Sequence, residues 1–279
     1  MPELPEVETV INAVAKAIGF SNIINVIINN NRFREKIPDD FIKKIKGSNI
    51  VSYKRIAKYI IIGLDNGLSI IWHLGMSGKI KICESIDENP EKHDHVIIQT
   101  EKFYLIFNDV RRFGLITYCE SDKILEHHLL KQIGKDPFDL DLSAKYLFEK
   151  LQKKKIAIKP ALLDQSIING IGNIYASEIL YLAKISPLRM ASLISLQECQ
   201  TLIEKTREVL QNAINAGGST IHDYKKPDGS LGYFQNRHCV YNKTGQKCPH
   251  CVSPNKNCEG IRKIVQAGRS TFYCDNIQK

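Results

Sequence analysis

The sequence has no apolar run that reaches the roughly 18–20 residues needed for a helix to span a membrane. Its first residues are acidic rather than basic, and they lack the apolar stretch of a secretory signal peptide. The sequence also has no internal repeat and no low-complexity tract. We therefore expect a globular protein of the cytoplasm with no membrane partner.

The 279 residues are 43% apolar, which is enough for ordinary hydrophobic cores in two or three modest domains. The formal net charge is +9. A basic balance favours a polyanionic partner, although many proteins with such a charge bind no nucleic acid. Charge alone therefore narrows the function without assigning it.

The eight cysteines divide into two groups. Three are isolated in apolar or amphipathic stretches and are expected to be plain thiols: Cys83, Cys119 and Cys199. Five crowd the C-terminal part of the chain: Cys239, Cys248, Cys251, Cys258 and Cys274. In a cytosolic chain such crowding indicates metal binding rather than disulfides.

The N-terminus carries two neighbouring residues that can act as a nucleophile and an acid. Removal of the initiator methionine, which is usual before a small residue, makes Pro2 a free secondary amine beside the carboxylate of Glu3. An α-amino group titrates much closer to neutral pH than a lysine does, so it needs little tuning to attack a carbonyl-like carbon. The alternative interpretation is that Pro5 opens a helix and the acidic residues lie favourably at its positive end.

The first part of the chain reads as one helix followed by strands. After Pro5, apolar residues recur at helical spacing as far as Gly19, which predicts an amphipathic helix. From Ile23 to about Tyr118 the pattern changes to short β-branched runs, with a turn expected at Asp65-Asn66-Gly67. This pattern predicts an antiparallel sandwich or barrel.

Beyond Pro137 the chain becomes helical. Ser143 is expected to cap a helix that runs through Gln152, and Ser195 to Glu198 form a capping box before a helix that ends at Gly217-Gly218. After Tyr233 short strands return together with paired cysteines, which predicts a small metal-stapled hairpin.

Several blocks, in order and over nearly the whole chain, resemble the formamidopyrimidine-DNA glycosylase family, the bacterial base-excision enzymes for oxidised purines. These blocks are Pro2 to Thr9, Lys58-Tyr59, His73 to Gly78, Lys92 to Val96, Asp109 with Arg111 to Gly114, Gly170 to Glu178, and Gly268 to Cys274. Each block alone is a weak match, but together they are specific. The resemblance favours the catalytic interpretation of the N-terminus.

The resemblance implies a division of catalytic roles. The Pro2 amine attacks C1′ of the sugar to form a Schiff base, and Glu3 supplies a proton and stabilises the opening sugar. Lys58, expected on a strand that continues through Ile61, donates a proton near the phosphate of the lesion; without the resemblance it reads equally well as a plain surface lysine. Arg269 is pressed into the DNA by the hairpin and assists proton transfer during elimination.

The resemblance also implies the DNA contacts. A flipped base leaves a hole in the duplex that an apolar wedge and a cation can fill, and the family assigns this to Met76, Arg111 and Phe113. Isolated Met and Phe residues more often belong to a core. Val110 stands where relatives carry proline. The remaining contacts with DNA are assigned to His93, Lys155 and Asn173, and Lys159 is a weaker candidate. Metal binding by the pair of His93 and His95 is not expected.

The C-terminal finger departs from the pattern of the family, in which two Cys-x2-Cys pairs bind one structural Zn²⁺. Cys248 and Cys251 are in place, but Cys274 follows after twenty-two residues and Ile277 occupies the position of the fourth ligand. Three hypotheses stay open. In the first, Cys258, which lies among extra residues around Ser253 to Glu259, is the fourth ligand of a rebuilt metal site. In the second, three cysteines bind the metal and His250 or water is the fourth ligand. In the third, the finger folds without metal.

The resulting expectation is a multidomain α+β fold. Residues 1–132 form a catalytic β-sandwich domain with an N-terminal helix, residues 133–233 a helical domain with a helix-two-turn-helix, and residues 234–279 a β-hairpin zinc finger. Damaged double-stranded DNA is the expected partner, in a basic cleft between the first two domains. We expect a monomer without a small-molecule cofactor.

The expected reaction is removal of 8-oxoguanine and formamidopyrimidines from duplex DNA, followed by strand cleavage through elimination. One alternative is an endonuclease VIII-like enzyme for oxidised pyrimidines, against which the Leu4 to Glu8 start and the Arg111 to Gly114 block argue. The other is a DNA-binding module that has lost catalysis, against which the intact Pro2, Glu3 and Lys58 argue.

Overall fold

The computed structural model describes the chain except at residues 87–90, 221–225, 228 and 252–257. Contacts within the chain divide it into two compact units. The first comprises Met1–Gln132 and Ile214–Gln235, and the second Ile133–Ala213 and Asn236–Lys279. The three-domain division expected from the sequence stays a prediction.

Among the described residues, no helix is both long and apolar enough to cross a membrane.

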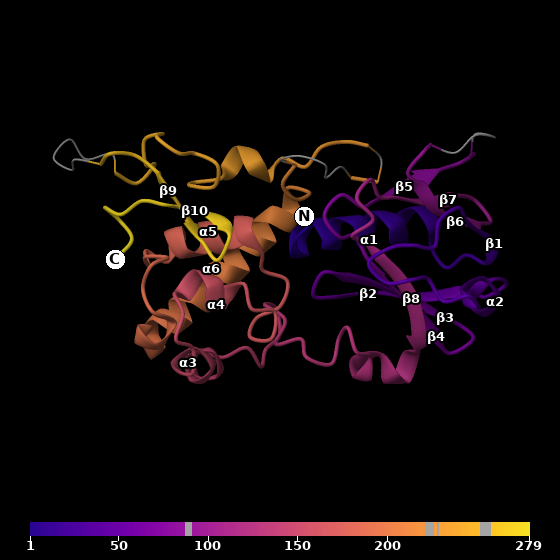
Figure 1. Cartoon of the computed structure of the whole chain (residues 1–279), viewed down its shortest axis with the longest axis horizontal. Helices are drawn as coiled ribbons and strands as arrows, with labels where there is room; N and C mark the ends of the chain where they lie inside the picture. Colours follow the sequence, from indigo (N-terminus) through magenta and orange to yellow (C-terminus); the bar gives the residue numbers. More distant parts are fainter. Residues whose placement is uncertain (87–90, 221–225, 228, 252–257) are drawn as a thin grey trace. The chain divides into compact units, whose positions relative to one another are not determined.

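The first unit is a β-sandwich with a helix at its N-terminus (Figure 1). One antiparallel sheet has the strand order β1-β6-β7-β5 and the other β2-β3-β4-β8. The sheets are formed by β1 (Ile23–Ile28), β2 (Ile50–Ile56), β3 (Tyr59–Leu64), β4 (Leu68–His73), β5 (Lys79–Cys83), β6 (Asp94–Thr100), β7 (Tyr104–Asn108) and β8 (Leu115–Glu120). Short helices accompany them: α2 (Phe41–Ile45) and η1 (Ser121–Glu126).

The helix α1 (Leu4–Ile18) forms where the apolar spacing predicts it. Its apolar positions pack into one core with residues of both sheets, among them Trp72 and Phe107. At its end Gly19 adopts a positive φ of 60°, which a glycine tolerates without strain. The helix therefore fixes the N-terminus of the chain against the sandwich.

The turns of the second sheet show one confirmed and one wrong prediction. Residues 65–67 join β3 to β4, as expected. Lys58, however, precedes β3, and with Ala57 it forms the tight connection from β2. Ala57 has a φ of 54°, a conformation that turns the chain sharply and ends the strand pairing. Lys58 therefore lies at the end of a hairpin, and not within a strand.

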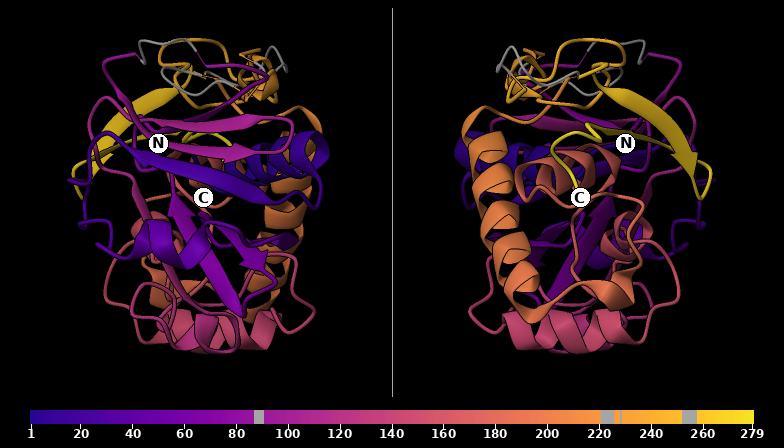
Figure 2. Two further views of the ribbon diagram at one scale, coloured as in Figure 1. Left: turned by 90° about the vertical axis from the view of Figure 1, so that its right-hand side faces the viewer. Right: turned by 90° about the vertical axis from the view of Figure 1, so that its left-hand side faces the viewer.

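The second unit is mainly helical and ends in a hairpin. It contains α3 (Ala144–Gln152), α4 (Ile158–Leu162), α5 (Asn173–Leu182), η2 (Ala191–Leu193) and most of α6 (Leu196–Asn215). The short η3 (Phe234–Arg237) leads from the first unit into the second. The hairpin is formed by β9 (Arg262–Gln266) and β10 (Arg269–Tyr273), which pair antiparallel as a curved ribbon (Figure 2).

The predicted helix starts of this unit are confirmed. The Ser143 hydroxyl accepts a hydrogen bond from the Tyr146 N–H at 3.2 Å. The Ser195 N–H donates to the Glu198 carboxylate at 2.9 Å, while the Glu198 N–H donates to the Ser195 hydroxyl at 3.2 Å. Both arrangements satisfy N–H groups that a helix leaves unpaired in its first turn.

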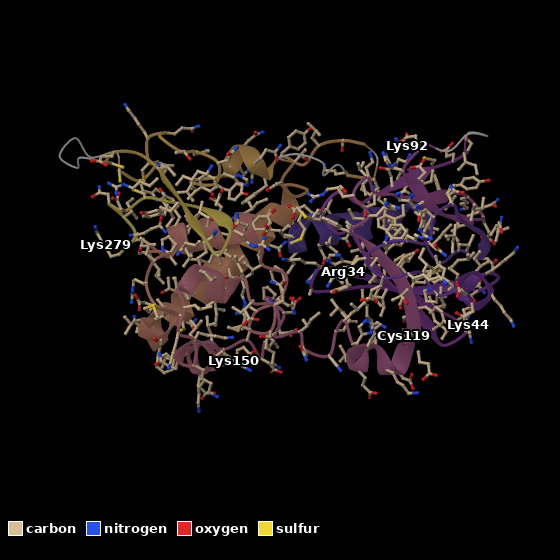
Figure 3. The ribbon with its side chains drawn as sticks, in the orientation of Figure 1. Arg34, Lys44, Lys92, Cys119, Lys150 and Lys279 are labelled. Carbon is tan, nitrogen blue, oxygen red and sulfur yellow. The ribbon has the colours of Figure 1, made fainter. Side chains whose placement is uncertain are left out.

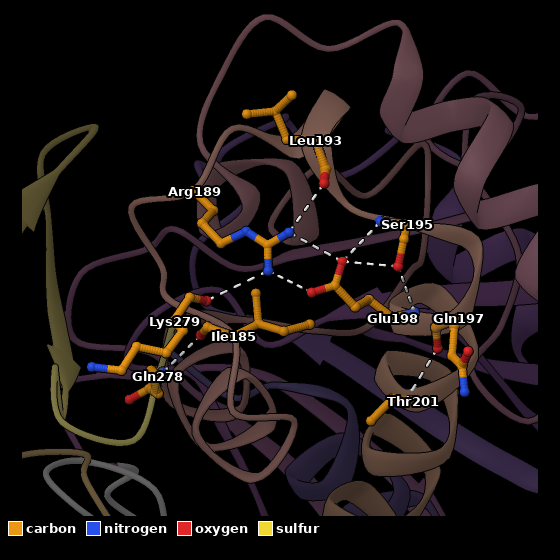
Figure 4. A network of polar contacts seen from close by, with 9 residues as sticks. All are labelled: Ile185, Arg189, Leu193, Ser195, Gln197, Glu198, Thr201, Gln278 and Lys279. Carbon is orange, nitrogen blue, oxygen red and sulfur yellow. Dashed lines mark hydrogen bonds and ion pairs between the residues drawn. The ribbon is translucent and has the colours of Figure 1, made fainter.

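Arg189 joins the start of α6 to the C-terminal residues (Figure 4). Its guanidinium forms a two-pronged ion pair with Glu198 and also donates to the Leu193 carbonyl at 3.0 Å. The pKa of Glu198 is lowered to about 2, and the largest cause is its hydrogen bonding to Arg189. The buried Gln278 donates to the Ile185 carbonyl at 2.9 Å, so the end of the chain is held in the same region.

Candidate functional site

Pro2 and Glu3 lie at the head of α1 and are both buried, whereas Met1 is exposed. The Glu3 N–H donates to Oε2 of Glu6 at 2.8 Å. The other oxygen of Glu6 accepts the N–H of Ser219 at 2.7 Å. Glu6, itself 1% exposed, therefore fixes the backbone of Glu3 and draws a distant segment of the chain against the N-terminus.

That segment was missed by sequence reasoning, which read Gly217-Gly218 only as a helix end. Gly218 has a φ of 79°, and a Cβ on it would lie 2.9 Å from Oε1 of Glu6. Only glycine therefore lets the backbone pass so close to this carboxylate in this conformation. The pair of glycines was the available signal, since such pairs often mark close backbone approaches.

His73, at the end of β4, is electrostatically coupled to Lys58. Burial, followed by the charges of Arg34 and Lys58, lowers the pKa of His73 to about 4. The Gly75 N–H donates to its Nδ1 at 3.0 Å. A neutral ring whose Nδ1 accepts must carry its proton on Nε2, so His73 offers a hydrogen-bond donor near Lys58. The sequence showed His73 within a motif but gave it no role.

Met76, Arg111 and Phe113 are all exposed. Met76 has a relative exposure of 40% and Phe113 of 47%, so neither belongs to the core. The Arg111 guanidinium lies over the Phe113 ring, 4.6 Å from its centroid. A cation and an apolar ring are thus presented together on the surface of the first unit.

The loops that carry these side chains are joined by the fully buried Asp109. Its Oδ1 accepts the Ser77 hydroxyl at 2.5 Å, and its Oδ2 accepts the Gly114 N–H at 2.8 Å. The Arg111 N–H in turn donates to the Ser77 oxygen at 3.0 Å. Residues 76–77 and 111–114 are therefore held as one structural element.

His93 and His95 have different surroundings. His95 is buried, and its Nε2 lies 2.9 Å from the Asp109 carbonyl oxygen. His93 is half-buried, with its ring centroid 6.1 Å from that of His95. Among the described residues, neither histidine belongs to a cluster of three metal-binding side chains. His93 is thus the more accessible ring of the two.

Positive charge is present on both units. Exposed lysines include Lys44 and Lys92 on the first unit and Lys150 on the second (Figure 3). Lys155 is also exposed, just beyond α3, whereas Lys154 pairs with Asp164 at 2.7 Å. Lys159 is only 1% exposed, and this burial is incompatible with the direct DNA contact considered from the sequence.

Asn173 is the first residue of α5, directly after Gly172. Its half-buried side chain is held by contacts within the second unit, where Oδ1 accepts from Lys159 at 2.6 Å and Nδ2 donates to the Ser270 carbonyl at 2.9 Å. Arg269, the neighbour of Ser270, is exposed at the start of β10. The helix start and the hairpin are therefore structurally coupled.

Four cysteines of the finger converge. The sulfurs of Cys248, Cys251, Cys258 and Cys274 all lie within 4.8 Å of one another. Cys274 Sγ is 3.6 Å from both Cys251 Sγ and Cys258 Sγ. Tetrahedral zinc with Zn–S bonds of about 2.3 Å would separate its sulfurs by about 3.8 Å. The group can therefore hold a metal ion, and Cys258 takes part although residues 252–257 lie outside the described ones.

Side chains outside the cysteine group also hydrogen-bond its sulfurs. The Tyr181 hydroxyl, on α5, lies 3.1 Å from Cys248 Sγ, and the Asn276 amide donates to Cys251 Sγ at 3.4 Å. His250 stacks on the Tyr181 ring at 5.2 Å between centroids. Ile277, at the position of the missing cysteine, packs against the same cluster.

Glu178 of α5 holds the chain that leads into the finger. Its carboxylate accepts three backbone N–H groups, from Cys239 at 2.7 Å, Val240 at 3.0 Å and Tyr241 at 2.8 Å. Burial raises the pKa of Glu178, although the three N–H groups act in the opposite direction. The finger is therefore attached to α5 both before and at its cysteines.

Two family models match the sequence. The Formamidopyrimidine-DNA glycosylase N-terminal domain matches residues 1–116, and the Formamidopyrimidine-DNA glycosylase H2TH domain matches residues 133–225. A relative from Rhodospirillum rubrum, named Formamidopyrimidine-DNA glycosylase, is 40% identical over 281 residues. One of the same name from Wolbachia pipientis wMel is 42% identical over 279 residues. Each alignment covers all of both chains.

Solved structures are similar over the whole chain as well. One is a complex of a Lactococcus lactis FPG mutant with a Fapy-dG containing DNA, with a TM-score of 0.90 and 37% identity. Another is MutM in complex with carbocyclic 8-oxo-G containing DNA, with a TM-score of 0.89 and 37% identity. Both cover 100% of this chain and 100% of the other.

Proposed function

The chain belongs to the formamidopyrimidine-DNA glycosylase family, and from that premise we propose how its residues divide the excision of oxidised purines. The protein is a base-excision DNA glycosylase with AP lyase activity that acts on damaged double-stranded DNA. The observation that carries the assignment of its active centre is the buried Pro2-Glu3 pair, fixed by Glu6 at the head of α1. A cytoplasmic location is part of the proposal and is supported by the bacterial relatives.

In the proposed mechanism, removal of Met1 frees the Pro2 amine. Its nitrogen forms a bond to C1′ of the damaged nucleotide while the bond from C1′ to the base breaks, and the base leaves with that electron pair and with the proton that the amine gives up. Glu3 supplies a proton to the ring oxygen as the sugar ring opens. A secondary amine gives an iminium that is cationic without a further proton. This charge acidifies the C2′ hydrogen, so that elimination expels the 3′ phosphate and then the 5′ phosphate.

Lys58 and Arg269 are the proposed proton-transfer residues of these eliminations. Lys58 is 7% exposed at the end of its hairpin and close enough to His73 for its charge to disfavour a second cation there. A neutral His73 next to a lysine suits a phosphate, because the ring donates from Nε2 while the lysine supplies the charge. Arg269, exposed at the start of β10, acts from the hairpin.

We assign Met76, Arg111 and Phe113 to the space that the flipped nucleotide leaves in the duplex. Their exposure and the stacking of Arg111 on Phe113 support this role, since the wedge must enter the stack while the guanidinium reaches the unpaired base. His93, Lys155 and Asn173 are the proposed contacts to the backbone of the DNA.

We also propose that Cys248, Cys251, Cys258 and Cys274 bind one structural Zn²⁺. The support is the convergence of four sulfurs within 4.8 Å of one another, with Cys274 Sγ 3.6 Å from two of them, close to the separation of about 3.8 Å in tetrahedral coordination. When bound, the ion would cross-link the hairpin to the chain segment that precedes it. Metal analysis of the purified protein tests this: one equivalent of zinc is expected, and less than a tenth of an equivalent would contradict it.

Borohydride trapping tests the reaction. Duplexes with 8-oxoguanine opposite cytosine should yield a covalent adduct, because borohydride reduces the iminium at Pro2. No adduct on any lesion would contradict the enzymatic assignment, and adducts with oxidised pyrimidines only would favour the endonuclease VIII-like alternative. A Pro2→Gly variant still forms an imine but with a primary amine, so it should react more slowly than the wild-type protein.

A further inference from the structure

Lys159 lies in the interior of the second unit, within α4 and directly before Pro160. It is among the largest fully buried side chains of the protein, with a relative exposure of 1%. A buried ammonium group is costly unless hydrogen bonds replace its water shell. The oxygens around it therefore indicate what this lysine does.

Three of these oxygens come from two other elements of the same unit. Lys159 Nζ lies 2.6 Å from Asn173 Oδ1, 2.8 Å from Thr271 Oγ1 and 3.0 Å from the Ser270 carbonyl oxygen. The first belongs to the start of α5 and the other two to β10. An ammonium group has three N–H donors, so it can donate to all three of these oxygens at once.

The contact with Asn173 fixes the orientation of its amide. An ammonium group only donates, so the amide must turn its oxygen, and not its nitrogen, toward Lys159. The NH₂ group then faces the hairpin, where Nδ2 donates a hydrogen bond to the Ser270 carbonyl oxygen at 2.9 Å. Nδ2 also lies 3.4 Å from the Tyr241 hydroxyl, a longer contact that a phosphate oxygen can replace.

We propose that Lys159 is a positioning residue for DNA binding. It orients the Asn173 amide as a donor toward the phosphate backbone and holds the start of β10, next to Arg269, against the start of α5. This inference rests on the proposed function, in which Asn173 and Arg269 contact DNA. It assigns to Lys159 an indirect role that its burial permits, in place of a direct phosphate contact.

The test combines Lys159→Met, Asn173→Ala and the double variant in a cycle. Methionine keeps most of the length of the side chain and removes the donor. The affinity of the full-length protein is measured by fluorescence anisotropy on a duplex with a tetrahydrofuran abasic-site analogue, at fixed salt. Lys150→Met serves as the matched control, because it removes the same charge from an exposed position on α3.

We expect Asn173→Ala and Lys159→Met each to weaken binding about tenfold to a hundredfold, the effect of losing a hydrogen bond to a charged group. The double variant should bind within about threefold of the weaker single variant, since both changes remove the same contact. Losses that multiply would overturn the inference, because they would show that Lys159 acts independently of Asn173. So would a Lys159→Met effect no larger than that of Lys150→Met, or an Asn173→Ala variant with wild-type affinity.

Thermal denaturation of each variant separates folding from binding. If Lys159→Met is unfolded at the assay temperature, the same cycle is run with Lys159→Gln, which keeps an N–H donor of shorter reach and should lose less affinity than Asn173→Ala. A wild-type protein with no preference for the abasic-site duplex over undamaged DNA would contradict the proposed function. That outcome differs from losses that multiply in a protein that still prefers the abasic-site duplex. Such losses would contradict only the role of Lys159 and leave the proposed function in place.

Discussion

The Asp109 carboxylate accepts the hydroxyl of Ser77 at 2.5 Å, and this bond connects the loop that carries Met76 to the loop that carries Arg111. Asp109 is fully buried and also accepts the Gly114 N–H. Neither loop can shift without breaking a hydrogen bond to a buried carboxylate. The proposed wedge is therefore preorganised before DNA arrives.

Asp109→Asn should loosen this element. The new NH₂ group can only donate and cannot face the Gly114 N–H, so it must turn toward the Ser77 hydroxyl, which then accepts instead of donating. A neutral amide thus replaces the buried carboxylate, and the charge-assisted hydrogen bonds of that carboxylate become ordinary ones. We expect the free energy of unfolding to fall by about 1–3 kcal/mol, and excision of 8-oxoguanine to slow more than stability alone explains. Urea denaturation and single-turnover excision measure the two effects.

The control is Asp40→Asn. Asp40 is exposed and accepts the Tyr118 hydroxyl at 2.7 Å. Its substitution should change stability by no more than about 0.5 kcal/mol and leave excision unchanged. Equal losses in the two variants would show that Asp109 has no special role in positioning the wedge.

Tyr181→Phe should weaken metal retention without unfolding the protein. The Tyr181 hydroxyl lies 3.1 Å from Cys248 Sγ, and hydrogen bonds to ligand atoms commonly change metal affinity by about 10–100-fold. Competition with a chromogenic chelator measures the affinity for zinc. Tyr146→Phe is the matched control, because the Tyr146 hydroxyl bonds the Ile167 carbonyl and lies outside the cysteine group. Equal affinities in both variants would contradict a role for Tyr181.

Local patterns in the sequence predicted local structure well. The helix through Gln152, the turn at residues 65–67 and the capping box at Ser195 depend on neighbouring residues, so spacing and turn chemistry were sufficient. The cysteine group was also foreseen as one of three hypotheses, because Cys258 lies among the extra residues around Ser253 to Glu259 that separate Cys251 from Cys274.

Contacts between distant parts of the chain were not predictable in the same way. Glu6 and Ser219 are 213 positions apart, and Lys159 and Thr271 are 112 apart. No periodicity encodes such pairs, since they depend on how complete elements pack. Lys159 showed the consequence: a lysine near a basic run reads as a surface group, but the fold places it inside.

Glu198 should contribute to stability in a pH-dependent way. The pKa of Glu198 is lowered from an ordinary 4.5 to about 2, chiefly by its hydrogen bonds to Arg189. A depressed pKa in the folded state gives stability that is present above the ordinary value and is lost as the pH falls toward 2. Glu198→Gln should therefore lower the melting temperature at pH 7 and have a smaller effect at pH 3.

The matched control for this prediction is Glu208→Gln, which breaks an exposed pair with Lys205 on the same helix. Exposed pairs contribute little, so its effect should be small at both values of pH. A Glu198→Gln difference that stays constant from pH 7 to pH 3 would contradict the assignment of the low pKa to Glu198.

Gly75→Ala tests how closely the two wedge loops must approach. Gly75 has a φ of 67°, and a Cβ on it would lie 2.4 Å from the backbone of Phe113 and Gly114. Because these are backbone atoms, no side-chain rotation relieves the clash, and the Met76 loop must move away. We expect single-turnover excision to slow at least tenfold, while circular dichroism shows that overall folding is retained.

Gly67→Ala is the control for backbone strain, since Gly67 has a φ of 80° but no atom within 4 Å of its Cβ position. It should lose about 1 kcal/mol of stability or somewhat more and keep its excision rate. If both variants lost excision equally, the strain of a positive φ would explain the effect, and the close approach of the loops would have no separate role.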